Sequence, residues 1–390
     1  MKILITSDWY IPAVNGVVTS VKNLRRELEA RGHEVRVLTL SQNHRSCERD
    51  GVTYLGSVAA GLIYPGARLR TALAGKWVRE LVEWGPDVVH SQCEFSTFFL
   101  ARRIAEELEI PLVHTYHTVY EDYTHYFSPN VRFGKKAAAV FTRWAASHTD
   151  CLIAPTGKVR LLLQGYGVQK PVFVVPSGID LRRFRSEPDP LRQNVLKASL
   201  DIPRDRTVLV FVGRLAEEKR VEELLRFRAD MGPGGVTLLL VGDGPDRQRL
   251  EGAAAGLGLS APDVVFAGMV PAEQVADWYQ LGDLFVSAST SETQGLTYAE
   301  ALAAGVPVLC RADPCLLGVV RDGENGWQYH DEAEFRTRLE DFLAHPLERE
   351  ALRRAARETG EEYSAQRFAE RVEAIYLEQI ERGSLRRIPA

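Results

Sequence analysis

The sequence contains few cysteines and no long run of apolar residues. Its 390 residues include five cysteines, and none of them forms a Cys-x-x-Cys pair. An odd, scattered set of this kind fits a reducing cytoplasm and offers neither a disulfide framework nor a zinc cage. No stretch reaches the roughly 18 apolar residues that a membrane-spanning helix needs. The N-terminal MKILITSDWY has too short an apolar part for a signal peptide and is typical of a first strand.

Several motifs that carry chemistry are also missing. There is no Gly-x-x-x-x-Gly-Lys-Ser/Thr of a P-loop kinase, no Gly-x-Ser-x-Gly of a hydrolase and no His-Glu-x-x-His of a zinc protease. The sequence also has no Asp-x-Asp that could clamp a metal-bound diphosphate. If a diphosphate binds, cations and helix dipoles must neutralise it, so we expect neither a metal nor a cofactor.

The charge of the chain is slightly negative and unevenly distributed. The formal net charge is −4, which argues against nucleic acid as a partner. Residues 1–175 carry 21 Lys and Arg against 16 Asp and Glu, a net of +5, whereas residues 176–390 carry 27 against 36, a net of −9. The N-terminal half is therefore the basic one.

Short apolar runs alternate with amphipathic helical runs along the chain, pause at the Pro- and Asp-rich SEPDPLRQN, and then restart. This pattern is typical of parallel, doubly wound α/β sheets, so we expect two Rossmann-like domains. We place them at 1–175 and 176–366, followed by a C-terminal helix at 367–390. The expected strands are 2–7, 33–40, 87–92, 111–116, 150–155, 171–176, 207–213, 236–242, 263–268, 283–289 and 307–310.

Ligands of such sheets bind beyond the carboxyl ends of the strands, so the strand-to-helix loops are where chemistry is expected. An Asn-Gly turn ends at Gly16 just before a helix, where the backbone can approach an anion closely. An ordinary loop glycine explains this turn as well. Gly242-x-Gly244 lacks the third small residue of a dinucleotide fingerprint, so we expect a tight turn capped by Asp243.

The stretch FVGRLAEEKRV places two cations at the end of an expected strand. Gly213 ends the apolar run, and Arg214 and Lys219 follow, with a helix predicted over 219–231. Guanidinium and ammonium groups at such a position suit a phosphate or diphosphate. The alternative is a solvated patch in which the cations pair with Glu217 and Glu218.

The stretch SASTSETQGLTYAEALAAGVPVL gives the strongest signal. A strand ends in a Ser- and Thr-rich loop, and Gly295 opens a helix whose first amides, with Leu296 and Thr297, can hold phosphate oxygens. Glu292 lies on the loop, and Glu300 lies about a turn and a half into the helix, within reach of a ribose. A solvated helix face is the alternative for Glu300, although its neighbours in sequence are apolar.

The histidine-rich HTYHTVYEDYTHY offers one active-site candidate. His114 and His117 are three residues apart on a strand, so they point to opposite faces and do not form a natural pair of metal ligands. His117, at the carboxyl end of the strand, is the candidate. His114 is expected in the core or behind His117.

Together, these residues resemble the retaining glycosyltransferases of family 4, which have the GT-B fold. FVGRLAEEKRV is similar to the Arg…Lys diphosphate motif of that family, ETQGLTYAE (292–300) to its Glu-x7-Glu motif, and VPSGID (175–180) to its interdomain signature. The resemblance covers nearly the full chain. It implies two Rossmann-like domains facing a cleft, a nucleotide-sugar donor on the C-terminal domain, an acceptor on the N-terminal domain and a last helix that crosses back to the N-terminal domain.

The resemblance also implies roles for single residues. Arg214 and Lys219 would hold the leaving diphosphate, with the Gly16 amides on its other side. Glu292 would bind sugar hydroxyls, and His117 would lie beside the transferred sugar. The remaining donor contacts would come from Glu300 at the ribose, the backbone near Met269 and Val270 at the base, and the amides of Gly295, Leu296 and Thr297.

Within the family, HTVYEDYTHY, ETQGLTYAEALAAGVPVLC and DPCLLGVVRDGENGWQY resemble bacterial diacylglycerol glucosyltransferases. The usual Glu-Gly-Phe-Gly is here Glu-Thr-Gln-Gly, and that departure matches the glycolipid-forming branch. The resemblance implies transfer of glucose from UDP-glucose to a lipid such as diacylglycerol, with retention of configuration.

The segment 131–148 is basic, free of acidic residues and interleaved with apolar side chains. Such a segment can lie on an anionic bilayer, gaining about 1 kcal/mol for each basic residue near the surface. We expect a membrane contact on the inner face of the cell membrane, and an amphipathic helix that packs Val140 and Phe141 on the sheet is the alternative. The expected membrane or acceptor residues are Tyr120, Arg132, Lys135, Lys136, Arg143 and Trp144.

Three other functions are compatible with these motifs: transfer to a soluble sugar or metabolite, epimerisation of a nucleotide sugar by a similar pair of Rossmann domains, and non-enzymatic sensing of a nucleotide sugar. The sequence leaves uridine and guanosine donors open, because the base contacts are mostly made by backbone. It also leaves open glucose, galactose or mannose as the sugar, and the oligomeric state.

Overall fold

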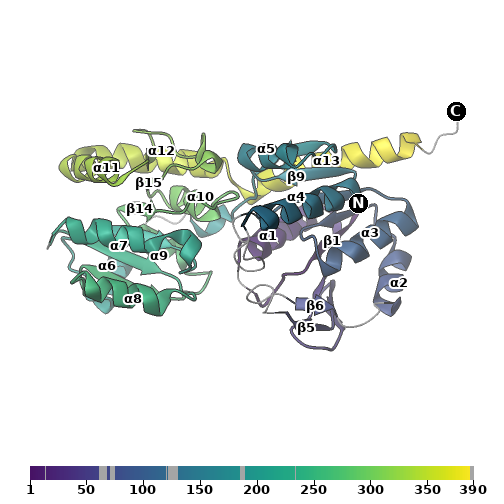
Figure 1. The fold of residues 1–390 in the computed structure, drawn as a ribbon, viewed down its shortest axis with the longest axis horizontal. Helices are drawn as coiled ribbons and strands as arrows, with labels where there is room; N and C mark the ends of the chain where they lie inside the picture. Colours follow the sequence, from purple (N-terminus) through teal and green to yellow (C-terminus); the bar gives the residue numbers. More distant parts are fainter. Residues whose placement is uncertain are drawn as a thin grey trace. The chain divides into compact units, whose positions relative to one another are not determined.

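The structure is a computed structural model that describes residues 1–13, 15–60, 68–70, 75–119, 121, 131–184, 189–232 and 234–386. The chain divides into two compact units (Figure 1). Met1–Gly178 and Ala365–Ala390 form the N-terminal unit, and Ile179–Ser364 forms the C-terminal unit. The joins therefore fall at 178/179 and 364/365, whereas the sequence placed them at 175/176 and 366/367.

The N-terminal unit contains an eight-stranded sheet in the order β10-β9-β8-β7-β1-β2-β4-β3, parallel except for the pairing of β3 with β4. Its strands are β1 Lys2–Ser7, β2 Glu34–Leu40, β3 Cys47–Arg49, β4 Val52–Leu55, β7 Val88–Ser91, β8 Leu112–Thr115, β9 Cys151–Ala154 and β10 Val172–Val174, with β5 Ser57–Ala59 and β6 Arg68–Arg70 as a separate pair. Its helices are α1 Gly16–Ala30, α2 Gly75–Trp84, α3 Ser96–Leu108, α4 Val131–Ser147, α5 Gly157–Gly165 and α13 Ala365–Arg386.

The C-terminal unit contains a six-stranded, fully parallel sheet in the order β13-β12-β11-β14-β15-β16. Its strands are β11 Thr207–Val212, β12 Val236–Val241, β13 Val264–Gly268, β14 Leu284–Ser287, β15 Val308–Arg311 and β16 Gly326–Tyr329. Its helices are α6 Pro190–Ser199, α7 Val221–Asp230, α8 Arg247–Gly256, α9 Val275–Leu281, α10 Leu296–Ala303, α11 Glu332–Ala344 and α12 Arg349–Glu361, with 3-10 turns η2 Leu181–Arg183, η3 Glu217–Lys219, η4 Pro314–Leu316 and η5 Pro346–Glu348.

All the strands that the sequence predicted are present, and it missed β3, β4, β5, β6 and β16. Most of the predicted strands are continuous apolar runs buried on both faces of a sheet, whereas β10 at the sheet edge is only partly buried. β3 and β4 form a hairpin around Asp50 and Gly51, both of which have positive φ. An Asp-Gly turn of this kind is a recognised hairpin signal. β16 was missed because its four residues, GWQY, do not form a long apolar run.

The last helix, α13, belongs to the N-terminal unit, as predicted. It packs on α1, and Figure 1 shows it in yellow among the purple and teal elements of that unit. Arg31 and His33, which follow α1, contact Glu373 at 2.6 and 2.8 Å. The residues it buries recur every three or four positions, as one helix face requires: Phe368, Ala369, Val372, Ile375 and Tyr376.

The VPSGID segment lies where the chain passes between the units. Asn23 Nδ2 of α1 donates to Gly178 O at 2.9 Å, and a Cβ at Gly178 would lie 2.5 Å from Ala365 Cα. Ile179 N donates to Tyr363 O at 2.8 Å on the other side of the join. The two crossings of the chain therefore run side by side, and glycine at 178 permits their close approach.

Candidate active site

The loop after β11 carries both cations of FVGRLAEEKRV, and backbone hydrogen bonds hold it to the loop after β12. Gly213 N donates to Val241 O at 2.9 Å, and Leu215 N donates to Asp243 O at 3.0 Å. A Cβ at Gly242 would lie 1.9 Å from Gly213 O. The glycine at 242 is thus required by the packing of two loops, and it keeps the segment around Arg214 in place.

The predicted tight turn at Asp243 is present, since its Oδ1 accepts a hydrogen bond from Gly244 N at 2.7 Å. The predicted start of the next helix was wrong by two residues. Lys219 ends the 3-10 turn η3, Arg220 adopts a left-handed φ of 52°, and α7 begins at Val221. The left-handed residue interrupts the helix and separates Lys219 from α7.

Each of the two cations is paired with a carboxylate. The Arg214 guanidinium contacts the Glu218 carboxylate, and Lys219 Nζ lies 2.5 Å from Glu292 Oε1. The side chains of Glu218 and Glu292 are 6% and 12% exposed, against 35% and 23% for Arg214 and Lys219. The carboxylates therefore lie deeper than the cations, which remain accessible to an anion from solvent.

The Lys219–Glu292 contact joins the loops that follow two neighbouring strands, β11 and β14. Ser291 Oγ adds a hydrogen bond to Glu218 O at 3.4 Å. The sequence placed Arg214, Lys219 and Glu292 in one site, and the structure brings their loops together. Both cations are paired with glutamates. The solvated-patch alternative predicted Glu218 as a partner, and Glu218 does pair with Arg214.

Gly295 forms the start of α10 in a conformation that suits glycine. Its φ is 73°, and a Cβ there would lie 2.5 Å from the Tyr298 ring. Tyr298 is buried and donates to Ser287 Oγ at 2.8 Å, which fixes the helix on the end of β14. The first amides of a helix have no intrahelical acceptor, so Leu296 and Thr297 present N–H groups at this end.

Glu300 lies on α10 and is mostly buried, so a solvated helix face does not describe it. Its Oε2 accepts a hydrogen bond of 2.8 Å from the hydroxyl of Tyr279, a fully buried residue of α9. Burial raises the pKa of Glu300 to about 7, although the Tyr279 hydrogen bond and the charge of Arg183 act in the opposite direction. A carboxyl group with this pKa can both accept and donate hydrogen bonds near neutral pH.

Met269 and Val270 directly follow β13 on the same sheet. Met269 is 68% exposed, whereas Val270 packs against the core of the C-terminal unit. The backbone between them is therefore fixed on one side and accessible on the other. Their predicted contact with a base stays a prediction.

In the N-terminal unit, Gly16 is the first residue of α1 and is exposed. Asn15 caps the helix, since its Oδ1 accepts from Val18 N at 2.9 Å. The position combines an exposed glycine with a helix N-terminus, as the sequence predicted. Its role towards a diphosphate stays a prediction.

His117 follows β8 and is partly buried. Its Nε2 lies 2.7 Å from Gln92 Oε1. Burial lowers the pKa of His117 to about 4, with the nearby Glu94 acting in the opposite direction. The ring is therefore neutral at physiological pH. His114 is buried, as expected, and its Nε2 lies 3.1 Å from Glu94 Oε1.

Three polar residues were missed from the sequence: Gln92 and Glu94, which interact with His117, and Asp8, which interacts with Glu94. Asp8 Oδ1 accepts from Thr97 N at 2.8 Å and so caps α3 from another element. Burial raises the pKa of Asp8 to about 6. Asp8 and Gln92 directly follow the buried strands β1 and β7, and Glu94 lies three residues after β7. Polar residues at strand ends were the available signal.

The buried residues of α4 are small, and its large apolar residues are exposed or only partly buried. Ala138, Thr142, Ala145 and Ala146 are at most 5% exposed, whereas Phe133 and Val140 are 69% and 56% exposed. The sequence alternative, in which Val140 and Phe141 pack on the sheet, is wrong for Val140. Ala145 and Ala146 instead join apolar clusters that contain residues of β8 and β9.

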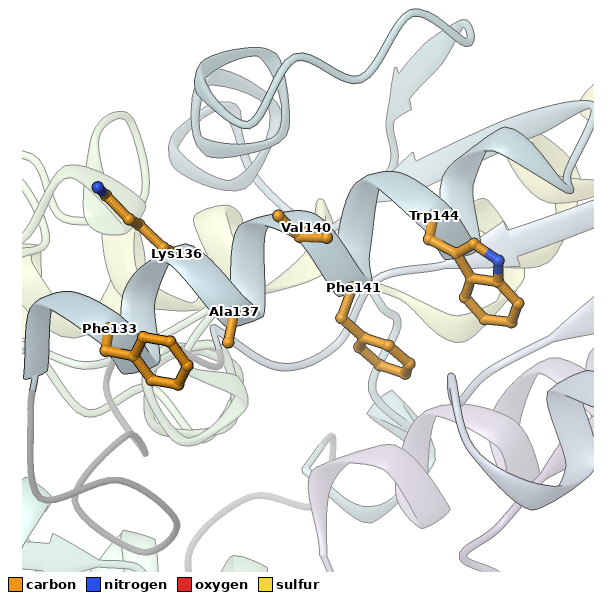
Figure 2. A pocket seen from close by; sticks show the side chains of 6 residues that line it. All are labelled: Phe133, Lys136, Ala137, Val140, Phe141 and Trp144. Atoms are coloured by element: carbon orange, nitrogen blue, oxygen red, sulfur yellow. The ribbon is translucent and has the colours of Figure 1, made fainter.

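Figure 2 shows Phe133, Ala137, Phe141 and Trp144 projecting along one side of α4, whereas Lys136 points to the other side. We call Phe133, Phe141 and Trp144 the α4 aromatic stripe. With Lys136, Ala137 and Val140 they line an open hollow of about 510 Å³. Near the start of α3, Phe95 stacks on Phe141 with 5.5 Å between ring centroids, and the Phe99 ring lies tilted against Trp144 at 5.4 Å. Phe95 and Phe99 are 43% and 52% exposed.

The basic residues of this segment differ in their surroundings. Arg132, Lys135 and Lys136 are exposed, and Lys135 Nζ lies 3.2 Å from Glu121 Oε2. The Arg143 guanidinium donates a hydrogen bond to Tyr166 O at 3.4 Å, so it already has a partner within the protein. Tyr120 lies outside the described residues.

In the described part of the chain, no three His, Cys, Asp or Glu side chains are arranged to hold a metal ion. Among the described residues, no helix combines the length and the apolar character that crossing a bilayer requires.

Two protein-family models match this chain. Glycosyltransferase Family 4 covers residues 14–183, and Glycosyl transferases group 1 covers residues 193–359. The alpha-monoglucosyldiacylglycerol synthase of Streptococcus pneumoniae is 34% identical over 97% of this chain and 86% of its own length. The chain belongs to the glycosyltransferases.

A second relative supports this assignment, and a solved structure supports the fold. The alpha-monoglucosyldiacylglycerol synthase of Acholeplasma laidlawii is 33% identical, over 98% of both chains. Sucrose-phosphate synthase from Thermosynechococcus elongatus has a similar structure, with a TM-score of 0.75 at 21% identity, covering 97% of this chain and 98% of that chain. This glycosyltransferase has the GT-B fold that its sequence predicted.

Proposed function

We propose that this glycosyltransferase moves glucose from UDP-glucose to a membrane lipid such as diacylglycerol, retaining the anomeric configuration and using no metal. The observation that carries the proposal is the similarity to two alpha-monoglucosyldiacylglycerol synthases over 97% and 98% of this chain. The exposed aromatic and basic residues of α4 support a lipid rather than a soluble acceptor.

The C-terminal unit is the proposed donor site. Arg214 and Lys219 would stabilise the negative charge that builds on the diphosphate as its bond to the sugar breaks. Preorganised charges that stabilise a transition state usually contribute more to catalysis than any other single effect. When a diphosphate pairs with Lys219, Glu292 would be released from that lysine and would bind sugar hydroxyls. The 2.5 Å Lys219–Glu292 contact supports a shared site for these two roles.

The other donor contacts follow from the described loops. Glu300 would bind the ribose, with Tyr279 holding one of its two carboxylate oxygens. The exposed backbone at Met269 and Val270 would meet the base, and the amides at Gly295, Leu296 and Thr297, with those at Gly16, would meet phosphate oxygens. His117 would contact the transferred sugar as a neutral ring.

The membrane contact is proposed for the α4 aromatic stripe, extended by Phe95 and Phe99. Aromatic side chains enter the interface between headgroups and acyl chains, and Lys136 and Arg132 would meet anionic headgroups. The protein would then be a cytoplasmic enzyme that binds the inner face of the cell membrane peripherally. No nucleic acid partner is expected.

The test is a lipid-partition assay. Radiolabelled UDP-glucose is incubated with the protein and diacylglycerol in mixed micelles that contain anionic lipid, with a chelator present. We expect label in the organic phase and an α-linked product by proton NMR. UDP-galactose and GDP-mannose, tested in parallel, report donor choice.

Each of the other outcomes supports a different function. Label that appears on a water-soluble acceptor, with none in lipid, would indicate transfer to a soluble sugar or metabolite. A changed hexose without any acceptor would indicate an epimerase. Activity lost with the chelator and restored by a divalent cation would contradict metal independence.

A further inference from the structure

A hydrogen-bonded row of buried side chains connects His117 to the C-terminal helix. His117 Nε2 lies 2.7 Å from Gln92 Oε1, and Gln92 Nε2 lies 3.0 Å from His90 Nε2. His90 Nδ1 in turn lies 2.6 Å from the Tyr376 hydroxyl on α13. The row joins the loop after β8, the end of β7 and a helix more than 200 residues later in sequence.

The chemistry of the amide fixes the direction of each bond. The Gln92 amide nitrogen can only donate, so His90 Nε2 accepts and His90 Nδ1 carries the proton that is donated to Tyr376. The Gln92 amide oxygen can only accept, so His117 Nε2 carries the proton. Thr115 Oγ1 lies 2.7 Å from the same nitrogen.

The row is shielded from water, so water does not compete for these bonds. Tyr376 and His90 are fully buried, and Gln92 and Thr115 are 1% exposed. Burial lowers the pKa of His90 well below its ordinary value, which keeps its ring neutral and its single proton on one nitrogen. A buried donor or acceptor left unpaired is strongly disfavoured, so the protons are held in one arrangement.

We infer that Tyr376, His90 and Gln92 are positioning residues that hold the His117 ring in the Nε2–H tautomer and leave Nδ1 as a hydrogen-bond acceptor. This inference rests on the proposed contact of His117 with the transferred sugar. A neutral imidazole with Nδ1 unprotonated accepts a hydrogen bond from a sugar hydroxyl and repels a second acceptor. The C-terminal helix thereby contributes to substrate positioning as well as to packing.

The tautomer can be measured without any activity assay. In the full chain labelled with ¹⁵N-imidazole histidine, the two ring nitrogens of His117 report which one carries the proton, and His117→Asn assigns the signal. We expect Nε2–H alone in the wild type. Gln92→Leu removes the acceptor at similar side-chain volume, and we expect a mixture of the two tautomers.

Transfer from UDP-glucose to diacylglycerol provides the second readout. The loss of one positioning hydrogen bond has a modest effect, so we expect kcat to fall about fivefold in Gln92→Leu and about threefold in Tyr376→Phe, with the KM for UDP-glucose changed less than about twofold. Ile375→Val is the matched control on α13, because it removes a buried methyl group beside Tyr376 and leaves the row intact. It should change neither tautomer nor kcat.

Two results would overturn the inference. One is a single Nε2–H tautomer and unchanged kcat in folded Gln92→Leu. The other is an equal loss of kcat in Ile375→Val and Tyr376→Phe, which would assign the effect to helix packing. If Gln92→Leu does not fold, Tyr376→Phe gives the same tautomer readout. If the wild type transfers no glucose, the proposed function fails, whereas the tautomers of His117 still decide whether the row positions it.

Discussion

Among single residues, the cations of the proposed donor site are already paired within the chain. Arg214 and Lys219 contact Glu218 and Glu292, and each carboxylate is more buried than its cation. These pairs hold the long basic side chains in fixed orientations before any ligand arrives. Such preorganisation reduces the cost of ordering the side chains when a diphosphate binds.

Lys219→Ala tests the electrostatic role of this pair. We expect kcat for glucose transfer to fall about 10²–10³-fold, by analogy with the loss of one charge-stabilising donor. Arg226→Ala removes an exposed cation of the nearby α7 and serves as the control, with kcat within about twofold of the wild type. A loss under tenfold in Lys219→Ala, with the circular dichroism spectrum unchanged, would rule out the proposed role.

Glu300 gives a prediction about pH. Burial raises its pKa from an ordinary 4.5 to about 7 in the folded chain. The folded protein therefore holds this proton more tightly than the unfolded chain, so the stabilisation linked to it is complete below about pH 4.5 and is lost as the pH rises through 7. We expect Glu300→Gln to be more stable than the wild type above neutral pH.

Urea unfolding of the C-terminal unit between about pH 5 and 8 measures this effect. The stability difference between Glu300→Gln and the wild type should grow with pH. Glu340→Gln replaces an exposed glutamate of α11 in the same unit and should show no such trend. A constant difference for Glu300→Gln across this range would contradict the raised pKa.

Among the secondary-structure elements, α4 shows how packing can invert a sequence pattern. The sequence alternative packed Val140 and Phe141 on the sheet, whereas the buried residues of α4 are alanines and Thr142. Phe133 and Val140 are exposed, and the partly buried Phe141 and Trp144 lie against the exposed phenylalanines of α3. An exposed apolar group of this extent, rimmed by basic residues, is typical of a surface that binds a membrane.

Lys136→Glu tests the membrane contact. Lys136 is the sharper choice than Lys135, because Lys135 is already paired with Glu121. Reversal of one charge changes the attraction by about 2 kcal/mol, so we expect binding to vesicles with anionic lipid to weaken about 30-fold. Lys22→Glu, on an exposed position of α1 in the same unit, is the matched control.

Sedimentation with vesicles that contain phosphatidylglycerol measures this binding. Vesicles of phosphatidylcholine alone measure the binding that does not depend on anionic headgroups. Phe133→Ser should weaken binding to both kinds of vesicle, because it removes apolar contact. Equal sedimentation of Lys136→Glu and the wild type would refute the membrane contact through this face.

In the molecule as a whole, α13 closes the core of the N-terminal unit although it follows the C-terminal unit in sequence. Phe368, Val372 and Tyr376 lie in one apolar cluster with residues of β1 and α1. The N-terminal unit therefore cannot complete its core until the whole chain has been made. The stability of this unit depends on residues that the C-terminal unit separates from it in sequence.

Phe368→Ala tests this dependence. Removal of a buried phenylalanine costs about 3–5 kcal/mol, and we expect the loss to fall on the N-terminal unit. Hydrogen exchange followed by mass spectrometry should show faster exchange in peptides from β1 and α1 than in those from β11 and β14. Leu377→Ala, at a 53% exposed position of the same helix, is the control and should leave both unchanged. Faster exchange confined to the C-terminal unit would contradict this assignment of α13.

The order of residues along the chain was enough to predict the parallel core strands, the two-unit organisation and the loops that carry Arg214, Lys219, Glu292 and His117. These features can be predicted because buried parallel strands have continuous apolar sequences and because ligands bind beyond the carboxyl ends of such strands. The β3–β4 hairpin also has a local signal, the Asp-Gly turn at Asp50 and Gly51, although its short strands lack long apolar runs.

Which side chains meet depends on the tertiary fold. The contacts of Lys219 with Glu292, of Tyr279 with Glu300, and of Tyr376 with His90 join residues that lie 73, 21 and 286 positions apart. No local pattern records such pairs, because they depend on strand order and on the return of α13. Which face of α4 is buried likewise depends on the strands and helices that pack against it, and these are distant in sequence.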